Sequence, residues 1–318
     1  MESMQALVKS RAGLRIERRD LPRLDDRDTV LVRVAFAGLC RTDLHVAEGR
    51  VAVELPRTLG HEVAGIVERA AAGSMLTPGQ RVTIQPAVPC GACVVCRAEG
   101  VAADPPRCVR PSFLGVHREG AFAEWLAVPA SVVLPLPDAV SLQRGAYVEP
   151  VAAALAVLRA PIDVTGARHE RGLIYGDNRI AELTRRILQA HGFEHVQVAA
   201  EGASLEDSSF DFAIETVPTG SALRALVSAV RPGGKIVLKS RPFDPVPLDL
   251  GAAVAKELSF HAVRYGSFRA AIELLSSERL PVDDLFEPAV PLASFERAFA
   301  HARGSESKKV FFTFDVGA

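Results

Sequence analysis

Four of the five cysteines in this 318-residue chain fall within one short segment. Cys90, Cys93 and Cys96 are separated by two residues each, and Cys108 follows after a longer interval. Four thiolates at such spacing can complete a closed tetrahedral zinc site, which stabilises a loop and leaves no position for a substrate. A set of free thiols is the alternative, but this regular spacing argues against it. We therefore predict a structural zinc ion with a loop folded around it.

The fifth cysteine, Cys40, belongs to a second candidate metal site together with His61 and Glu62. A thiolate, an imidazole and a carboxylate make a three-ligand zinc centre with one coordination position open for catalysis. Neighbouring side chains of an extended segment point to opposite faces, so we expect His61 as the constant ligand and Glu62 as a supporting or exchangeable one. Each residue alone fits a buried thiol or a core histidine. Together with the cysteine cluster they predict a catalytic zinc.

The residues after Cys40 suggest a path for a proton. If this segment is helical, Thr42 and His45 share one face. A hydroxyl beside an imidazole could carry a proton from a substrate alcohol to solvent. Asp43 is a carboxylate of the kind that orients a metal-bound histidine. His45 could instead be an ordinary surface residue. We predict catalytic roles for Thr42, His45 and Glu62.

Composition limits the partners of the chain. Hydrophobic residues make up 48% and charged residues 24%, as in globular proteins. A formal net charge of -1 gives no electrostatic case for binding nucleic acid or an anionic membrane. The sequence shows neither an apolar run of membrane-spanning length nor a signal-peptide pattern. We therefore expect a cytoplasmic protein that acts on a small molecule and uses its cysteines for metal.

The pattern of apolar residues changes after Pro150. Before it, short alternating segments such as 29–35 predict strands separated by Pro- and Asp-rich turns. After it, an apolar helix is predicted at 151–158, and a strand at 172–176, a helix at 180–191 and a further strand at 196–199 alternate. A turn at 231–234 is predicted to precede another strand at 235–238. Such alternation predicts a parallel sheet of Rossmann type.

Two motifs resemble those of a known protein family. The first is Cys40-Arg41-Thr42-Asp43 with His45, and the second is Gly60-His61-Glu62 followed by Gly65. They resemble those of the zinc-dependent medium-chain dehydrogenase/reductase family, which includes alcohol, polyol and threonine dehydrogenases. The likeness extends over most of the chain. It implies an α/β protein, with a GroES-like β-barrel catalytic domain at 1–150, completed by 267–318, and a shortened Rossmann-type nucleotide-binding domain at 151–266. It also implies a homodimer or homotetramer.

The resemblance implies further roles for single residues. Glu149, in a Glu-Pro pair like that of the polyol and threonine dehydrogenase branch, would supply a carboxylate to the catalytic zinc. It could instead be a glutamate that the macrodipole stabilises at a helix N-terminus. Arg41 would reach the cofactor pyrophosphate. The interval before Cys108 is longer than is usual in the family, so we expect a reshaped loop at 97–107.

The nucleotide motif departs from the family. The Gly-x-Gly-x-x-Gly fingerprint reads Gly176-Asp177-Asn178-Arg179-Ile180-Ala181, so an asparagine replaces the glycine that lets backbone approach a diphosphate. Ala200 occupies the place of the acidic ribose ligand, with Glu201 next to it, and a helix-plus-strand unit after it is missing. We expect weak NAD(P) binding. The candidate cofactor-binding residues are Arg41, Gly176, Asn178 and Glu201.

Two activities are compatible with these motifs. In the first, two zinc ions per chain support a dehydrogenase in which an alcohol gives up hydride to a nicotinamide and a proton to Thr42 and His45. In the second, NAD(P) binding is lost and the zinc centre serves a lyase, epimerase or cyclase. The resemblance favours the first. We interpret the basic pair Lys308-Lys309 as a solvated start of the last strand.

Overall fold

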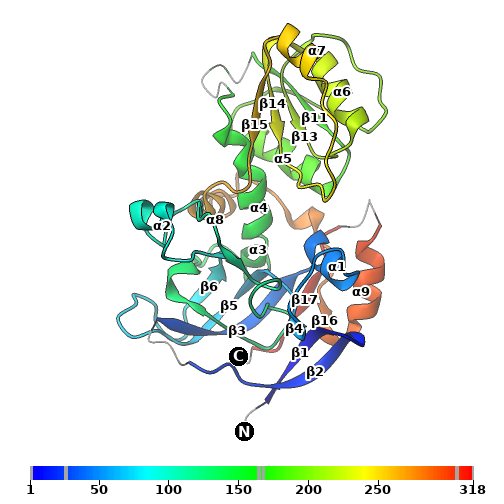
Figure 1. Ribbon diagram of the computed structural model, residues 1–318. Coiled ribbons are helices and arrows are strands. Elements are labelled where there is room, and N and C mark those ends of the chain that lie inside the picture. The colour runs from blue at the N-terminus through cyan, green and yellow to red at the C-terminus, as the bar shows by residue number, and fades with distance from the viewer. Residues whose placement is uncertain (1–2, 25–27, 163–165, 167–168, 305–307, 317–318) are drawn as a thin grey trace. The chain divides into compact units, whose positions relative to one another are not determined.

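The computed structural model describes residues 3–24, 28–162, 166, 169–304 and 308–316. The chain divides into two compact units (Figure 1). Unit 1 contains Met1–Pro150 and Phe268–Ala318, and unit 2 contains Val151–Ser267. The chain thus leaves unit 1 once and returns to it for its last segment.

Unit 1 contains a small antiparallel sheet near the N-terminus. Its strand order is β2-β1-β4, with β1 at Ser3–Ser10, β2 at Gly13–Asp20 and β4 at Arg57–Thr58. β1 and β2 form a tight hairpin that closes at the pair Ser10 and Gly13. Gly13 has a φ of 108°, a conformation that favours glycine, so the sequence itself marks this turn.

A seven-stranded sheet forms the centre of unit 1. Its order is β10-β6-β5-β3-β17-β16, and β9 also pairs with β3. The bounds are β3 Thr29–Gly38, β5 Glu62–Arg69, β6 Arg81–Ile84, β9 Trp125–Pro129, β10 Val133–Pro135, β16 Val290–Pro291 and β17 Phe311–Thr313. β17 pairs antiparallel with β3, so the end of the chain contributes a strand to a sheet that the N-terminal half began.

Short elements surround this sheet. The helices of unit 1 are α1 (Arg41–Ala47), α2 (Val94–Glu99), α3 (Leu142–Ala146), α8 (Phe268–Ser276) and α9 (Phe295–Ala302), and β7 (Ala87–Val88) pairs with β8 (Ser112–Phe113). α4 (Val148–Leu155) begins in unit 1 and ends in unit 2. Among the described residues, no helix combines the length and apolar character that crossing a bilayer requires.

Unit 2 is built on a five-stranded parallel sheet with the order β12-β11-β13-β14-β15. The strands are β11 Arg171–Tyr175, β12 His195–Ala199, β13 Phe210–Glu215, β14 Val230–Leu238 and β15 Ser259–Ala262. The helices are α5 (Arg179–Ala190), α6 (Gly220–Ala229) and α7 (Leu250–Ala255). These elements match the parallel sheet that the sequence predicts.

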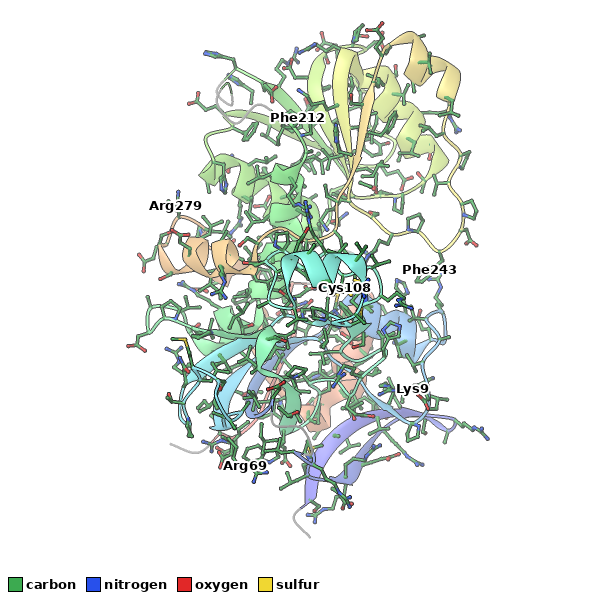
Figure 2. All side chains as sticks on the ribbon, turned by 60° about the vertical axis from the view of Figure 1, so that its left-hand side comes forward. Lys9, Arg69, Cys108, Phe212, Phe243 and Arg279 are labelled. Atoms are coloured by element: carbon green, nitrogen blue, oxygen red, sulfur yellow. The ribbon has the colours of Figure 1, made fainter. Side chains whose placement is uncertain are left out.

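The sheet of unit 2 is buried on both faces. Leu173 and Tyr175 of β11 lie in one core cluster, whereas Ile174 between them lies in another. Successive side chains of a strand point to opposite faces, so the two clusters lie on opposite sides of the sheet. Phe212, labelled in Figure 2, belongs to the second cluster and meets Phe193 edge-on, with ring centroids 5.5 Å apart.

Some elements of unit 2 differ from the sequence prediction. The predicted turn at 231–234 lies inside β14, where Phe210 pairs with Val230 and Phe212 already with Lys235, so the extra residues bulge out of the ladder. The helix predicted at 151–158 begins earlier, at Val148, and ends at Leu155. Residues 200–209, all described, join β12 to β13 without a helix or strand. The parallel sheet of unit 2 is therefore shorter by one helix-plus-strand unit at this point.

Candidate active site

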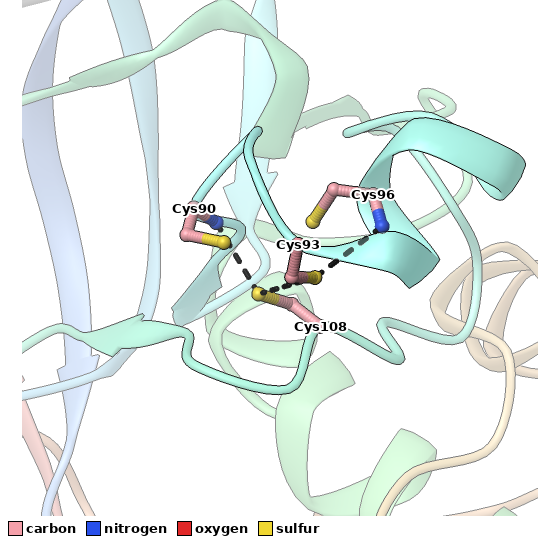
Figure 3. A group of neighbouring side chains, drawn as sticks. All are labelled: Cys90, Cys93, Cys96 and Cys108. Carbon is pink, nitrogen blue, oxygen red and sulfur yellow. Dashed lines mark hydrogen bonds between the residues drawn. The ribbon is translucent and has the colours of Figure 1, made fainter.

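The four cysteines of the predicted structural zinc site converge in unit 1 (Figure 3). All four sulfur atoms lie within 4.8 Å of one another. The backbone N–H of Cys90 donates to the Sγ of Cys108 at 3.3 Å. Cys93 is the residue before α2, and its Sγ accepts the N–H of Cys96 at 3.4 Å. The loop before α2, the first turn of α2 and the later segment that carries Cys108 thus bring the four sulfur atoms together.

The donor set fits a zinc ion. A tetrahedral site with Zn–S bonds of about 2.3 Å separates its sulfurs by about 3.8 Å, and Cys93 and Cys108 lie 3.9 Å apart. The N–H groups of Cys96 and Val109 lower the pKa of Cys93 to about 6. Burial and the neighbouring thiols raise the pKa of Cys96 to about 12. Four thiols this close cannot all ionise without a cation between them.

The loop 97–107, which precedes the last cysteine, also supports α8. The carboxylate of Asp104 accepts the backbone N–H of Phe268 at 2.6 Å and that of Arg269 at 2.9 Å. These N–H groups stand at the start of α8, where no helical partner is available to them. Sequence reasoning missed this role of Asp104, because nothing in the sequence links a loop residue to a helix so far along the chain.

Strand pairing brings the second group of metal-ligating residues together. Cys40, His61 and Glu62 each offer a ligand atom within 4.8 Å of the others. Cys40 follows the end of β3, and His61 immediately precedes β5. β3 and β5 pair antiparallel with Gly38 opposite Glu62, so the ladder places the end of one beside the start of the other.

Asp43 fixes the backbone on both sides of this group. Its Oδ2 accepts the N–H of Cys40 at 2.9 Å, and its Oδ1 accepts the N–H of Gly60 at 3.0 Å. The same Oδ1 lies 3.4 Å from Nδ1 of His61, and both side chains are buried. Burial lowers the pKa of His61, but Asp43 and Cys40 raise it by more, so its pKa lies well above the ordinary value. Asp43 therefore stands where a carboxylate orients a metal-bound imidazole.

Lys309 is buried beside Glu62, contrary to our interpretation of it as a solvated residue. Its Nζ forms an ion pair with the Glu62 carboxylate and donates to the Leu39 carbonyl at 3.0 Å. A Cβ on Gly38 would overlap the Glu62 carboxylate, so only glycine leaves room for the pair. The period of the strand gives no signal for this, because Val310 and Phe312 on the other face are buried as well as Phe311.

Glu149 lies near this group without joining it. It is buried near the start of α4. Burial raises the pKa of Glu62, the Lys309 ammonium lowers it, and the charge of Glu149 raises it. Among the described residues, the cluster within mutual reach of a metal contains Cys40, His61 and Glu62 only. The structure therefore places Glu149 close to Glu62 but outside the set within 4.8 Å.

Thr42 and His45 lie on α1, directly after Cys40. The segment is helical, so they occupy positions i and i+3 on one face. Burial and the nearby charges of Arg50 and Arg41 lower the pKa of His45, although Glu48 acts in the opposite direction. His45 is therefore neutral near pH 7 and able to accept a proton. Arg41 itself is exposed.

The nucleotide turn of unit 2 is occupied by a side chain of the protein itself. The Asn178 Oδ1 accepts the N–H groups of Ile180 and Ala181 at 3.0 and 3.1 Å, and thereby caps α5. Its Nδ2 donates to Oγ1 and O of Thr216 at 3.0 and 3.3 Å. The amides that would receive a diphosphate are therefore already bonded, and a diphosphate would have to displace the Asn178 side chain to reach them.

Gly176 and Glu201 complete the predicted nucleotide residues. Gly176 directly follows β11 and has a φ of 122°, and a Cβ there would collide with Thr216. Glu201 is exposed, and its Oε1 accepts the Thr219 hydroxyl at 2.9 Å. Its carboxylate is thus held at the start of α6, beyond the end of β12.

Comparison with known proteins gives this architecture a family. Residues 26–138 match the alcohol dehydrogenase GroES-like domain. D-xylulose reductase A from Aspergillus niger is 26% identical over 337 residues, which cover 93% of this chain and 92% of that protein. The 2-dehydro-3-deoxy-L-galactonate 5-dehydrogenase of Pseudoalteromonas atlantica is 28% identical over 309 residues, which cover 87% and 88%.

The solved structures agree in fold. An alcohol dehydrogenase from Escherichia coli CFT073 in complex with NADH superposes with a TM-score of 0.87 at 22% identity, over 99% of this chain and 100% of that one. A GroES-like unit combined with a parallel-sheet unit is therefore the fold that this chain shares with that dehydrogenase. Residues 26–138 thus belong to the alcohol dehydrogenase GroES-like domain family, and most of the chain is similar to dehydrogenases of the kind expected from the zinc-dependent medium-chain dehydrogenase/reductase resemblance. The predicted family and fold class are confirmed.

Proposed function

We propose that this protein is a zinc-dependent oxidoreductase that interconverts an alcohol group of a small polyol or sugar derivative with the corresponding carbonyl, using a nicotinamide cofactor. The observation that carries the proposal is the convergence of the half-buried Cys40 with the buried His61 and a buried carboxylate, with Asp43 behind the imidazole. The names of the relatives, a xylulose reductase and a deoxygalactonate dehydrogenase, support the substrate class and the redox reaction.

Unit 1 would carry the catalysis and unit 2 the nucleotide. Cys40, His61 and either Glu62 or Glu149 would hold the catalytic zinc, and the set of Cys90, Cys93, Cys96 and Cys108 would hold the structural one. The catalytic zinc would supply Lewis acidity toward the substrate oxygen, and a nicotinamide would accept or return the hydride. The residues of the protein itself would keep the His61 ring oriented through Asp43 and would supply negative charge around the bound cation.

The proton would move along α1. When the alcohol is oxidised, its O–H proton passes to the Thr42 hydroxyl, which gives up its own proton to the neutral His45 imidazole. His45 then releases the proton to solvent. When a carbonyl is reduced, the same groups work in reverse and return a proton to the product oxygen. The lowered pKa of His45 suits the oxidation direction at neutral pH.

We also propose cytoplasmic residence and a homodimer or homotetramer. All five cysteines fall in the two metal-ligating groups, which suits a reducing compartment. β15 stands at the end of the strand order of unit 2. A strand at such an edge offers backbone groups with which a second copy could pair.

The test is to measure metal content and turnover on the same preparation. The purified chain should contain two zinc ions, by mass spectrometry of the metal, and should reduce NAD+ or NADP+ with at least one member of a panel of pentitols, hexitols and sugar acids. Cys40→Ser should retain one zinc ion and less than about 1% of the turnover. Full turnover by Cys40→Ser, or none by the zinc-replete wild type across the panel, would contradict the proposal.

A further inference from the structure

The carboxyl ends of β11 and β13 form the place in unit 2 where connections diverge. β11 leads through α5 to β12 on one side, and β13 leads through α6 to β14 on the other. In doubly wound sheets, ligands bind in the crevice that such a divergence leaves at the carboxyl ends of the strands. Any dinucleotide bound in the manner of this fold would lie across these two strand ends.

Asn178 links the two sides of this divergence by hydrogen bonds. It follows β11, and its Nδ2 reaches Thr216, the residue directly after β13, through both Oγ1 and the carbonyl. Thr216 is itself fixed, since its Oγ1 donates to the Tyr175 carbonyl at 2.8 Å. The side chain of Asn178 therefore makes four hydrogen bonds in this turn, to Ile180 and Ala181 on its own helix and two to Thr216.

We infer that Asn178 acts as an internal competitor for the diphosphate of the cofactor and sets the affinity of the protein for NAD(H). The inference rests on the proposed function only in taking a nicotinamide dinucleotide as the cofactor. To bind, the diphosphate must displace the Asn178 amide from the N–H groups of Ile180 and Ala181 and break its bonds to Thr216. Those bonds oppose binding because a ligand gains only the difference between the old and new partners.

Charge near the turn acts in the same direction. Asp177 is exposed immediately before Asn178, so it places a carboxylate beside any incoming diphosphate. Asp177 cannot be the cap, because the cap oxygen belongs to Asn178. The two effects can be separated by substitution, since removing the Asn178 side chain frees both amides and leaves the charge of Asp177 in place.

The experiment is calorimetric titration of the zinc-loaded full chain with NADH, which measures binding without hydride transfer. Asn178→Gly should bind NADH about tenfold more tightly than the wild type, because two backbone N–H groups become available and a glycine cap keeps α5 folded. Asn178→Asp keeps a capping oxygen and adds a negative charge, so it should bind no more tightly than the wild type. Thermal denaturation verifies that each variant is folded.

Ser141→Gly is the matched control. Ser141 caps α3 in unit 1 with a neutral side chain that accepts the N–H of Arg144, so the substitution removes an equivalent cap elsewhere. Its affinity for NADH should equal that of the wild type. An Asn178→Gly affinity equal to or weaker than the wild type, or undetectable binding in both, overturns the inference. Tight NADH binding by Asn178→Gly without oxidation of any polyol would instead contradict the proposed function and leave the inference standing.

Discussion

Lys309 and Glu62 form an ion pair inside unit 1, where their side chains are 7% and 1% exposed. Lys309 comes from the C-terminal segment and Glu62 from β5, next to the candidate ligand His61. Removing two charges from water is unfavourable unless each finds partners, and here the Leu39 carbonyl provides a further one for the ammonium. The pair therefore joins the C-terminal segment to the group of Cys40, His61 and Glu62, and the Lys309 ammonium balances the charge of the Glu62 carboxylate.

Lys309→Met should destabilise the protein by about 3 kcal/mol, because it leaves the Glu62 carboxylate buried without its counter-charge. The free energy of unfolding from guanidinium denaturation measures this. Lys308→Met is the matched control, since Lys308 is exposed, and it should change stability by less than about 0.5 kcal/mol. The double variant Glu62→Gln/Lys309→Met should lose less than the sum of the two single variants. Strict additivity would show that the pair does not couple.

The two cysteine groups should separate in a metal analysis. Cys93→Ser should lose the structural zinc and lower the thermal midpoint, since Cys93 also caps the start of α2. Cys40→Ser should lose the other zinc with a smaller change in thermal midpoint, because its segment is already held by β3 and by Asp43. Metal content by mass spectrometry and calorimetric melting check both statements. Loss of both ions in either variant would mean that the sites are not independent.

Glu149, more than Glu62, should carry the carboxylate ligation of the catalytic zinc. The Lys309 ammonium already neutralises Glu62, so Glu62 has less charge to offer a cation. Glu149→Gln should weaken zinc affinity at this site at least tenfold, measured by competition with a chelator, while Glu62→Gln should weaken it less. The reverse order would assign the ligand role to Glu62.

His45 should set the acid limb of alcohol oxidation. Its pKa is lowered by burial and by the nearby Arg50 and Arg41, so the neutral, proton-accepting form is lost only as the pH falls through a value below 6.5. The wild-type kcat should therefore be flat near pH 7 and decline below about pH 6.5. His45→Gln should lose about a hundredfold in kcat at pH 7 and lack this decline. His301→Gln, on the exposed face of α9, is the control and should leave the profile unchanged.

Asp104→Ala should lower stability by about 1 kcal/mol, because the first N–H groups of α8 lose their acceptor. Hydrogen exchange at the amides of Phe268 and Arg269 should accelerate. Asp104→Asn, which keeps a capping oxygen, should lose less. Asp244→Ala, in an exposed loop, serves as the control. Unchanged exchange in Asp104→Ala would show that α8 does not depend on this contact.

Local pattern was sufficient for much of the fold. Alternating apolar residues predicted β3, and the strand–helix alternation predicted the parallel sheet of unit 2. Regular cysteine spacing predicted the four-sulfur group because ligands close in sequence need only a short loop to converge. The bulge in β14 was mistaken for a turn before the strand, since a Pro-Gly-Gly segment has the same composition in either setting.

Contacts between distant segments were beyond the sequence. Lys309 was taken as solvated because its lysine neighbour suggests a charged surface, and only the pairing of the last strand with β3 shows that it is buried. The bonds of Asn178 to Thr216 depend in the same way on which strands are neighbours in the sheet.

The sequence by itself determined the donor atoms for the metals, the alternation of strands and helices, and the loss of glycine from the nucleotide turn. These properties are set by residue type and by spacing within a few turns of chain. The tertiary structure alone decided that Lys309 pairs with the Glu62 carboxylate, that the loop with Asp104 caps α8 and that the Asn178 side chain bonds to the first N–H groups of α5. Such outcomes follow from strand pairing and burial, which bring together groups that no local pattern connects.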